Sequence, residues 1–206
     1  MSFNTKIPYY LRSVATIGLI CCMVLPVLAK PDISLPPPET TGGIPLMQAI
    51  TARATNRSFS HKALTPQVLS NMLYAAFGVS HEDKHTIPTA LNKKDLKVFV
   101  IKSDGAYLYK PTENALELIT SDDLRPLLAK QSFVLEAPVT LVYAGSNERW
   151  VPLHAGSAYQ NVGLYAASVG LNNVVRGSFD EKGLAKELKL KRNESVVISQ
   201  TVGWPK

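Results

Sequence analysis

Residues 152–169 constrain the fold of this chain more than any other segment. Their pattern is helical, and small residues recur along it: Ala155, Gly156, Ala158, Gly163, Ala166 and Ala167. Small side chains let a helix pack closely on its neighbours, because the interaxial distance depends on the side chains at the contact. We therefore expect a long helix at the centre of the fold.

Shorter helices and strands surround this segment. Helices are predicted for residues 44–53, 67–77, 121–130 and 180–188. Strands are predicted for residues 97–101, 106–109, 115–119, 139–143 and 195–202, and residues 80–94 and 170–180 are predicted as loops. Because a hairpin signal such as Asp104-Gly105 joins neighbouring strands, and helices do not alternate with them, the pattern predicts an α+β fold.

Several helix ends have recognisable signals. Thr65 and Pro66 are expected to cap and begin the helix that Gly78 ends. Ser121-Asp122-Asp123 is expected to cap the short helix that reaches Lys130, and Asp180 to cap the next one.

The first residues of the chain have the pattern of a secretory signal. Lys6 and Arg12 form a positive region, residues 14–27 are almost wholly apolar, and small residues precede a cut after Ala29. A retained membrane anchor is the alternative, but the apolar run is shorter than the roughly 20 residues that a span needs. Residues 1–29 are therefore predicted to be a cleaved signal that meets the membrane only transiently, which predicts a periplasmic protein.

Cysteines and charge exclude several classes of function. Cys21 and Cys22 both lie in the predicted signal, which leaves the mature chain without a disulfide scaffold, a thiolate metal site or a cysteine nucleophile. The net charge of the chain is +6, and Lys6 and Arg12 supply two of these charges. The remaining basic residues are scattered and lack interleaved aromatics, which favours a solvated surface over nucleic-acid binding.

The mature chain divides into a tether and one domain. Residues 30–45 include five prolines, which exclude a helix or a central strand and predict an extended arm or linker. Residues 46–206 are long enough for a single domain with its own core.

One motif match points to zinc. His81-Glu82-Asp83-Lys84-His85 fits H-E-x-x-H, which binds zinc only on a helix that places its two imidazoles one turn apart. Gly78 precedes the motif and Pro88 follows it, and apolar flanks are missing. We expect a solvated polar loop, and no metal site is assigned.

Three other segments carry groups that suit a ligand. Residues 53–59 combine two arginines with two hydroxyls, which suit a phosphate, although a basic helix end explains them equally well. Residues 88–94 are rich in side-chain donors, and an ordinary exposed loop is the alternative. In residues 170–180, Gly177 can bring its backbone N–H against a ligand ring, or the segment is a plain loop before Asp180.

Taken in order, six motifs resemble the nitroreductase superfamily over nearly the whole mature chain. They are Arg53-Ala54-Thr55-Asn56-Arg57, residues 72–78, Pro88-Thr89-Ala90-Leu91-Asn92, Ala137-Pro138-Val139, the small-residue helix as far as Gly170-Leu171, and Gly177-Ser178-Phe179-Asp180. Each motif alone is common, whereas all six in order are specific. The pattern is most similar to the branch that contains thiazole/oxazole-forming dehydrogenases.

The resemblance implies an FMN-binding fold with a central, mostly antiparallel sheet flanked by helices, and an intertwined homodimer with flavin sites at the subunit interface. It implies that Arg53 and Thr55 bind the phosphate and ribityl chain, beside Ala54 and Arg57. It also implies that Thr89, Ala90 and Asn92 line the flavin, near Lys94. The segment Arg176-Gly177 would lie along the flavin ring, with a backbone N–H near its N5 atom.

Four features depart from the family pattern. Ala54 replaces an arginine, Leu91 a glycine and Lys94 a glutamine, and the family continues past Lys206 with a further basic phosphate ligand. We expect Lys206 to take that role or FMN to bind less tightly.

The resemblance implies an exported FMN-dependent oxidoreductase that acts on a small organic substrate, with NAD(P)H as a possible reductant. No catalytic acid or base is assigned, because the flavin itself carries the redox chemistry. The alternatives are a periplasmic flavin-binding or scaffold protein without turnover and, third, a zinc peptidase.

Overall fold

The computed structural model describes residues 1–2, 32–146 and 149–206. Apart from Met1 and Ser2, the predicted signal lies outside these residues. Within the described part, none of the helices has the length and apolar character needed to cross a membrane.

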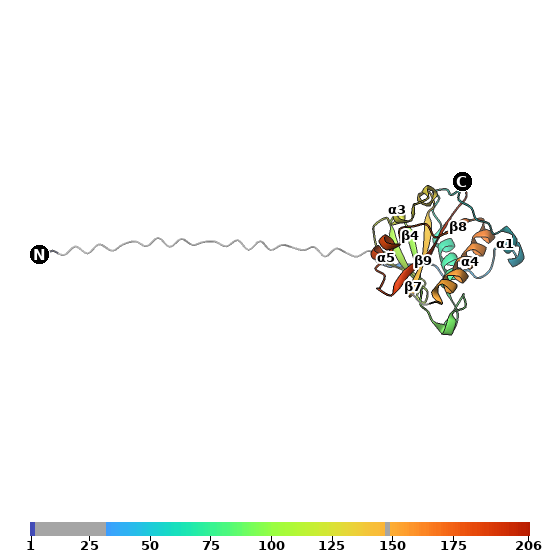
Figure 1. Cartoon of the computed structure of the whole chain (residues 1–206), viewed down its shortest axis with the longest axis horizontal. Coiled ribbons are helices and arrows are strands. Elements are labelled where there is room, and N and C mark those ends of the chain that lie inside the picture. The colour runs from blue at the N-terminus through green and yellow to red at the C-terminus, as the bar shows by residue number, and fades with distance from the viewer. Residues whose placement is uncertain (3–31, 147–148) are drawn as a thin grey trace.

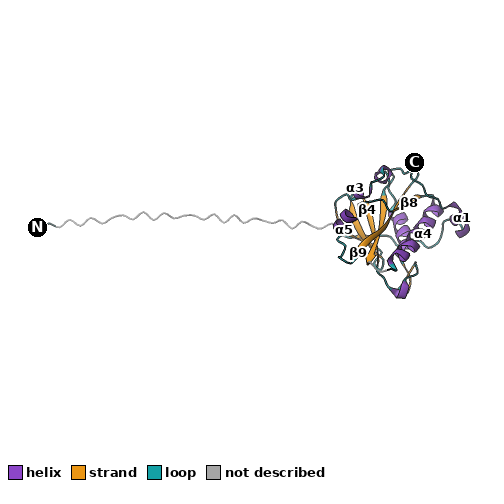
Figure 2. Cartoon of the chain, in the orientation of Figure 1, coloured by secondary structure: helices purple, strands orange, loops and turns teal. Residues whose placement is uncertain are grey.

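A seven-stranded sheet forms the centre of the molecule, in the order β1-β6-β5-β4-β7-β9-β8 (Figure 2). The strands are β1 Ile33–Ser34, β4 Leu96–Lys102, β5 Gly105–Lys110, β6 Ala115–Thr120, β7 Val139–Ser146, β8 Asn172–Arg176 and β9 Glu194–Gly203. Every pairing within this sheet is antiparallel. The predicted α+β class with a central antiparallel sheet is therefore confirmed.

Helices cover both faces of the sheet (Figure 1). The helices α1 Leu46–Ala52, α2 Pro66–Phe77 and α4 Val151–Val169 lie on one side, and α3 Arg125–Leu128 and α5 Glu181–Glu187 lie on the other. Side chains alternate along β4, so that Val100 packs in the core below α2 and α4 and Phe99 in the core below α3 and α5. The molecule therefore has three layers with the sheet in the middle.

The long helix α4 occupies the central position that its small residues predict. Five of its side chains, Val151, Ala155, Ala158, Val162 and Ala166, are fully buried in the core cluster between the helices and the sheet. Gly170 ends the helix with a left-handed backbone, φ 76°. The small side chains let α4 contact α1, α2 and four strands of the sheet.

The predicted helix ends are confirmed at two places and wrong at a third. Thr65 Oγ1 accepts a hydrogen bond from the Val68 amide (3.2 Å), and Asp180 accepts one from the Gly183 amide (3.1 Å). The short helix α3 begins only at Arg125 and ends before Lys130. The Asp123 carboxylate accepts hydrogen bonds from the backbone amide of Arg125 and from its guanidinium group. It therefore fixes the Arg125 side chain as well as the start of the helix.

Two segments predicted as loops contain regular structure, and those predictions are wrong. Residues 80–94 contain the hairpin of β2 Val79–His81 and β3 Lys84–His85 and the 3₁₀ turn Ala90–Asn92. Residues 170–180 contain β8, which pairs with β9 along its whole length. The two asparagines that begin β8 have low strand propensity, and the ladder with β9 overrides it. A further 3₁₀ turn, Ser132–Leu135, also falls in a segment with no predicted structure.

The Pro-rich segment lies along the edge of the sheet. Its strand β1 pairs with β6, and Leu35 is buried. Ser70 Oγ (2.6 Å) and Asn114 Nδ2 (2.8 Å) both donate to the carbonyl of Pro36. Prolines that cannot donate to a ladder are tolerated at such an edge, which positions the following helix α1 against α4.

Candidate functional site

Arg53 follows α1 and lies over the one buried glycine of α4. A Cβ atom placed on Gly163 would lie 3.5 Å from Arg53 Cδ and 3.6 Å from Asn173 Oδ1. The missing side chain at Gly163 therefore makes room for the aliphatic part of the arginine, while its guanidinium end remains partly exposed.

The edge strand β8 fixes the segment after Arg53. The Asn56 amide donates to the carbonyl of Asn173 (3.0 Å), and Asn172 Nδ2 donates to the carbonyl of Ser58 (2.7 Å). Ala54, Thr55 and Arg57, which lie along this segment, are exposed. The backbone is thus held while the side chains stay accessible.

The arginines of this segment are not neutralised within the chain. In the described part of the molecule, neither Arg53 nor Arg57 forms an ion pair with a carboxylate, although other basic residues do. Lys206, for example, pairs with Glu136 at 2.8 Å. Two guanidinium groups without an ion-pair partner among the described residues, on the same segment as the Thr55 hydroxyl, supply the charge and the directional donors that a phosphate ester requires. This donor set fits the phosphate of FMN.

The two residues predicted at the end of β8 differ in what they offer. The Arg176 side chain is only 6% exposed and donates to the carbonyls of Leu128 (3.0 Å) and Ser178 (3.2 Å). Burial lowers its pKa, and the group supports the layer of α3. Gly177 has open space where a side chain would be. The backbone at Gly177 is therefore accessible to a ligand, whereas the guanidinium of Arg176 is bound to carbonyl groups of the chain.

The loop of residues 88–92 has a left-handed backbone at Leu91. Leu91 has φ 55° and Asn92 has φ 53°, the left-handed region that glycine adopts easily. Leu91 is 82% exposed, so its side chain has no core to fill. The position therefore has the backbone conformation that suits the glycine expected there.

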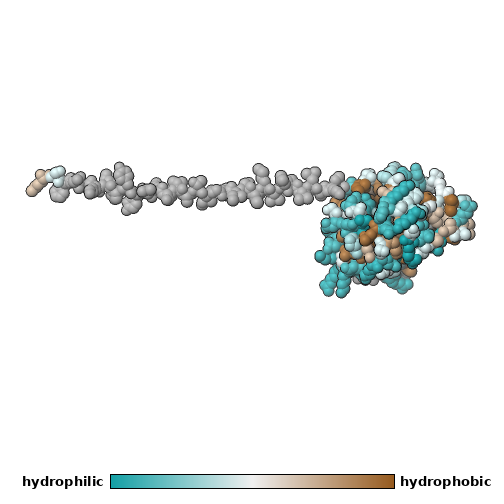
Figure 3. Space-filling view, turned by 90° about the horizontal axis from the view of Figure 1, so that it is seen from above, coloured by the Kyte–Doolittle hydropathy of each residue, from teal (hydrophilic) through white to brown (hydrophobic). Residues whose placement is uncertain are grey.

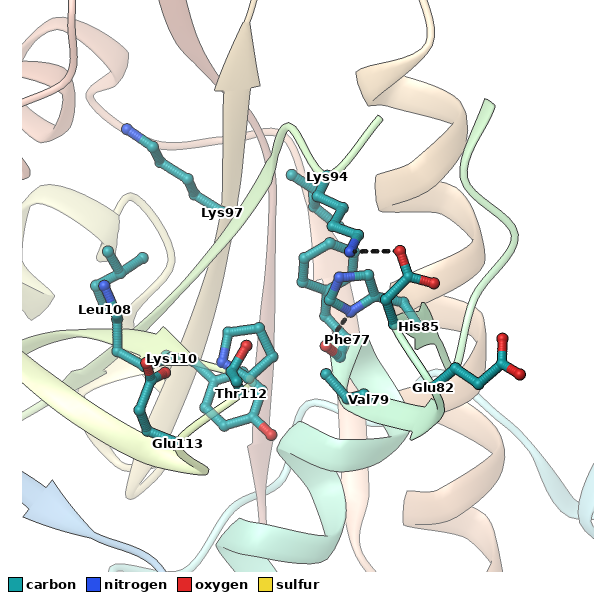
Figure 4. A pocket seen from close by; sticks show the side chains of 14 residues that line it. Phe77, Val79, Glu82, His85, Lys94, Lys97, Leu108, Lys110, Thr112 and Glu113 are labelled. Atoms are coloured by element: carbon teal, nitrogen blue, oxygen red, sulfur yellow. Dashed lines mark hydrogen bonds and ion pairs between the residues drawn. The ribbon is translucent and has the colours of Figure 1, made fainter. Parts of the chain in front are cut away.

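An unpredicted carboxylate fastens this loop to the β2–β3 hairpin. Asn92 Nδ2 and Lys94 Nζ both lie 3.2 Å from Asp83 Oδ2, and Figure 4 shows the Lys94 bond. The hydrogen bond from Asn92, followed by the bond and the charge of Lys94, lowers the pKa of Asp83 to about 2. Asn92 and Lys94, both predicted to bind the cofactor, are thus turned toward the hairpin in this conformation.

The H-E-x-x-H residues do not form a zinc-protease site. His81 and His85 lie on opposite strands of the hairpin, where they cannot stack one turn apart. His85 Nδ1 lies 2.9 Å from the carbonyl of Phe77, and the two rings are parallel with centroids 3.9 Å apart (Figure 4). Among the described residues, no group of three potential metal ligands occurs. The stacked pair forms one wall of a cleft of about 460 Å³ that shares only Lys94 with the predicted flavin residues.

A buried histidine that sequence analysis did not assign holds the other side of the loop. His154 Nε2 accepts the Ala90 amide (2.8 Å), and His154 Nδ1 lies 3.1 Å from Asp95 Oδ1. The spacing of His154 and Asp95 in the sequence carries no signal, because only the packing of α4 against β4 brings them together. Asp83 was missed because its contacts with Asn92 and Lys94 depend on the β2–β3 hairpin, which was not predicted.

The predicted residues form two groups, and one chain does not bring them together. Arg53 contacts α4 at Gly163, and the 88–92 loop contacts it at His154. These positions are about two and a half turns apart, which places them on opposite flanks of the helix. The predicted site residues of one chain therefore include two separate groups, the Arg53 group and the 88–92 loop.

Comparisons with known proteins agree with this fold and these motifs. A model of the nitroreductase family matches residues 50–204. The chain is 31% identical over 182 residues to a provisionally named nitroreductase of Methanocaldococcus jannaschii, with 78% of this chain and 90% of that protein covered.

Solved structures show the same arrangement. A provisionally named nitroreductase from Ralstonia eutropha JMP134 is 34% identical, with a TM-score of 0.79 over 85% of this chain and 90% of that one. A chain of the E. coli microcin synthetase McbBCD complex has a TM-score of 0.65 over 96% of this chain and 85% of its own. At 20% identity, this second likeness shows the fold alone.

Proposed function

The chain belongs to the nitroreductase family, and on this premise we propose that it is an FMN-dependent oxidoreductase. The observation that carries the proposal is the pair of guanidinium groups, Arg53 and Arg57, which have no ion-pair partner in the described part of the chain and share one segment with Thr55. The resemblance to the family implies that this segment binds the phosphate, and Gly163 leaves space for Arg53 on α4.

The Arg53 group and the 88–92 loop bind different parts of the flavin. Arg53, Thr55 and Arg57 hold its phosphate and ribityl chain, while Ala54 keeps the backbone between them unobstructed. Thr89, Ala90 and Asn92 line the ring, and the backbone N–H at Gly177 is positioned to donate to it. When bound, FMN takes electrons from a reductant such as NAD(P)H and passes them to a small organic substrate. The chain supplies charge, orientation and an apolar surface for this chemistry, and no side-chain acid or base is needed.

We propose that the working form is a homodimer. The short helix α1 exposes Leu46 (64%), Met47 (69%) and Ile50, and the apolar colouring at this end of the molecule is visible in Figure 3. Exposed apolar residues gathered on one element mark an interaction surface. A second copy docked there would bring the Arg53 group of one chain to the 88–92 loop of the other. The two groups would then form one complete flavin site.

We also propose that the protein is exported and works in the periplasm. The support is the charged, apolar and small-residue pattern of residues 1–29. The mass of the secreted protein tests this, since cleavage after Ala29 removes Lys6, Arg12 and both cysteines.

The function is tested in two half-reactions without oxygen. The FMN-loaded protein is mixed with NADH or NADPH, and the flavin absorbance is expected to fall; a quinone or a nitroaromatic compound is then expected to restore it. If chemical mediators reduce the flavin but no acceptor reoxidises it faster than free FMN, the protein is not an oxidoreductase.

One observation favours the second candidate, a flavin-binding protein without turnover. Asn92 and Lys94, which the resemblance assigns to the flavin, both donate their side-chain hydrogen bonds to Asp83. Retention of FMN without reduction by NADH, NADPH or mediators is the result that this candidate predicts.

A further inference from the structure

The loop that we propose lines the flavin has an unfavourable backbone conformation. Leu91 and Asn92 are consecutive and both have positive φ, 55° and 53°. In this region the Cβ atom crowds the following carbonyl, so residues other than glycine avoid it. Such a conformation persists only where surrounding contacts hold it.

One contact fixes the loop to the helix below it. The amide of Ala90, immediately before Leu91, donates to His154 Nε2 at 2.8 Å. His154 is only 3% exposed and lies in the first turn of α4, a rigid central element. Because a backbone N–H can only donate, Nε2 must be the unprotonated nitrogen of the ring.

A second contact selects that form of the ring. Nδ1 then carries the hydrogen and donates to Asp95 Oδ1 at 3.1 Å. The other oxygen of Asp95 accepts from Ser146 Oγ at 3.3 Å, which fixes the carboxylate at the end of β7. The hydrogen bond of one nitrogen thus determines what the other nitrogen can do.

We propose that His154 is a positioning residue for the flavin site, which fixes Ala90 and the loop after it through a neutral, Asp95-oriented imidazole. Without this contact, the loop is free to leave its unfavourable conformation. The consequence for FMN rests on the proposed function, whereas the contact between Ala90 and His154 does not.

Two variants separate this role from simple packing. His154→Gln keeps one donor and one acceptor on a side chain that does not titrate. His154→Phe keeps an aromatic ring but has neither group. His61→Gln, at an exposed histidine far from the loop, is the matched control.

The first measurement is hydrogen exchange of the Ala90 amide in the flavin-free protein, relative to its intrinsic rate. Loss of one hydrogen bond is expected to lower protection by about five- to tenfold in His154→Phe and to leave it largely intact in His154→Gln. His61→Gln should keep the Ala90 protection of the unmodified protein.

The second measurement is FMN affinity. FMN binding is expected to weaken in His154→Phe and to stay close to that of the unmodified protein in His154→Gln. An Ala90 amide that exchanges at its intrinsic rate in the unmodified protein overturns the proposal, even if His154→Phe fails to fold. If FMN binds to none of these proteins, the proposed function fails, while the Ala90 result still decides whether His154 holds the loop.

Discussion

At the scale of single residues, the site depends on which charged side chains already have partners within the chain. Arg176 was expected beside the flavin, yet its guanidinium donates to a carbonyl of α3, whereas Arg53 and Arg57 form no ion pair within the described residues. Sequence motifs can identify the backbone segment that meets a ligand. They do not reveal where a side chain turns, since that depends on neighbours far away in the sequence.

Asp83 gives a residue-scale prediction with a defined pH range. Hydrogen bonds from Asn92 and Lys94 lower its pKa from 3.8 to about 2. A carboxylate with a lowered pKa contributes stability that is fully present above its ordinary pKa and is lost as the pH falls through the folded value. The link between hairpin and loop should therefore persist at pH 4 and weaken toward pH 2.

A carbon NMR titration of the Asp83 carboxyl measures this directly. The expected midpoint is about 2. In Asn92→Ala, which removes the largest cause, the midpoint should rise. A midpoint near 3.8 in the unmodified protein would show that neither partner binds Asp83 in solution.

At the scale of elements, strong local signals were sufficient for some parts of the fold and not for others. The Thr65-Pro66 and Asp180 signals predicted helix starts, because each cap satisfies its own first turn. Strand β8 was missed because its stability comes from the ladder with β9. The contact of His154 with Asp95 could not be predicted either, because it depends on how α4 packs on the sheet.

Two glycines give an element-scale prediction. A Cβ on Gly145 of β7 would lie 2.4 Å from the carbonyl oxygen of Asp95, whereas one on Gly177 would meet nothing within 4 Å. Gly145→Ala should therefore lower the free energy of unfolding by about 1–3 kcal/mol. Gly177→Ala should change it by less than about 0.5 kcal/mol.

Thermal unfolding and FMN titration of the same two proteins check this pair. Gly177→Ala is expected to keep its melting temperature and yet bind FMN about tenfold more weakly, because the methyl group enters the space assigned to the ring. Unchanged FMN affinity in this variant would remove Gly177 from the site.

At the scale of the whole molecule, the exposed apolar face of α1 indicates an interface with a second copy of the chain. Only Ala49 of this helix is buried, and so short a helix is marginal alone in water. We expect the protein to sediment as a dimer. The double variant Met47→Asp and Ile50→Asp should shift it to a monomer, since charged side chains are depleted at the core of interfaces.

Thr112→Asp adds the same type of charge at an exposed turn remote from α1 and should leave the dimer intact. A monomeric unmodified protein would contradict the proposed interface. It would also leave the Arg53 group and the 88–92 loop on opposite flanks of α4 without a way to meet.

The most direct test of the flavin assignment is the absorbance spectrum of the protein after saturation with FMN and removal of free flavin. The account predicts flavin bands that correspond to one FMN per chain. It also predicts that Arg53→Ala weakens binding by about ten- to a hundredfold, as expected for the loss of a charged hydrogen bond, while Arg192→Ala at the exposed surface does not. Protein that elutes without flavin bands would contradict it.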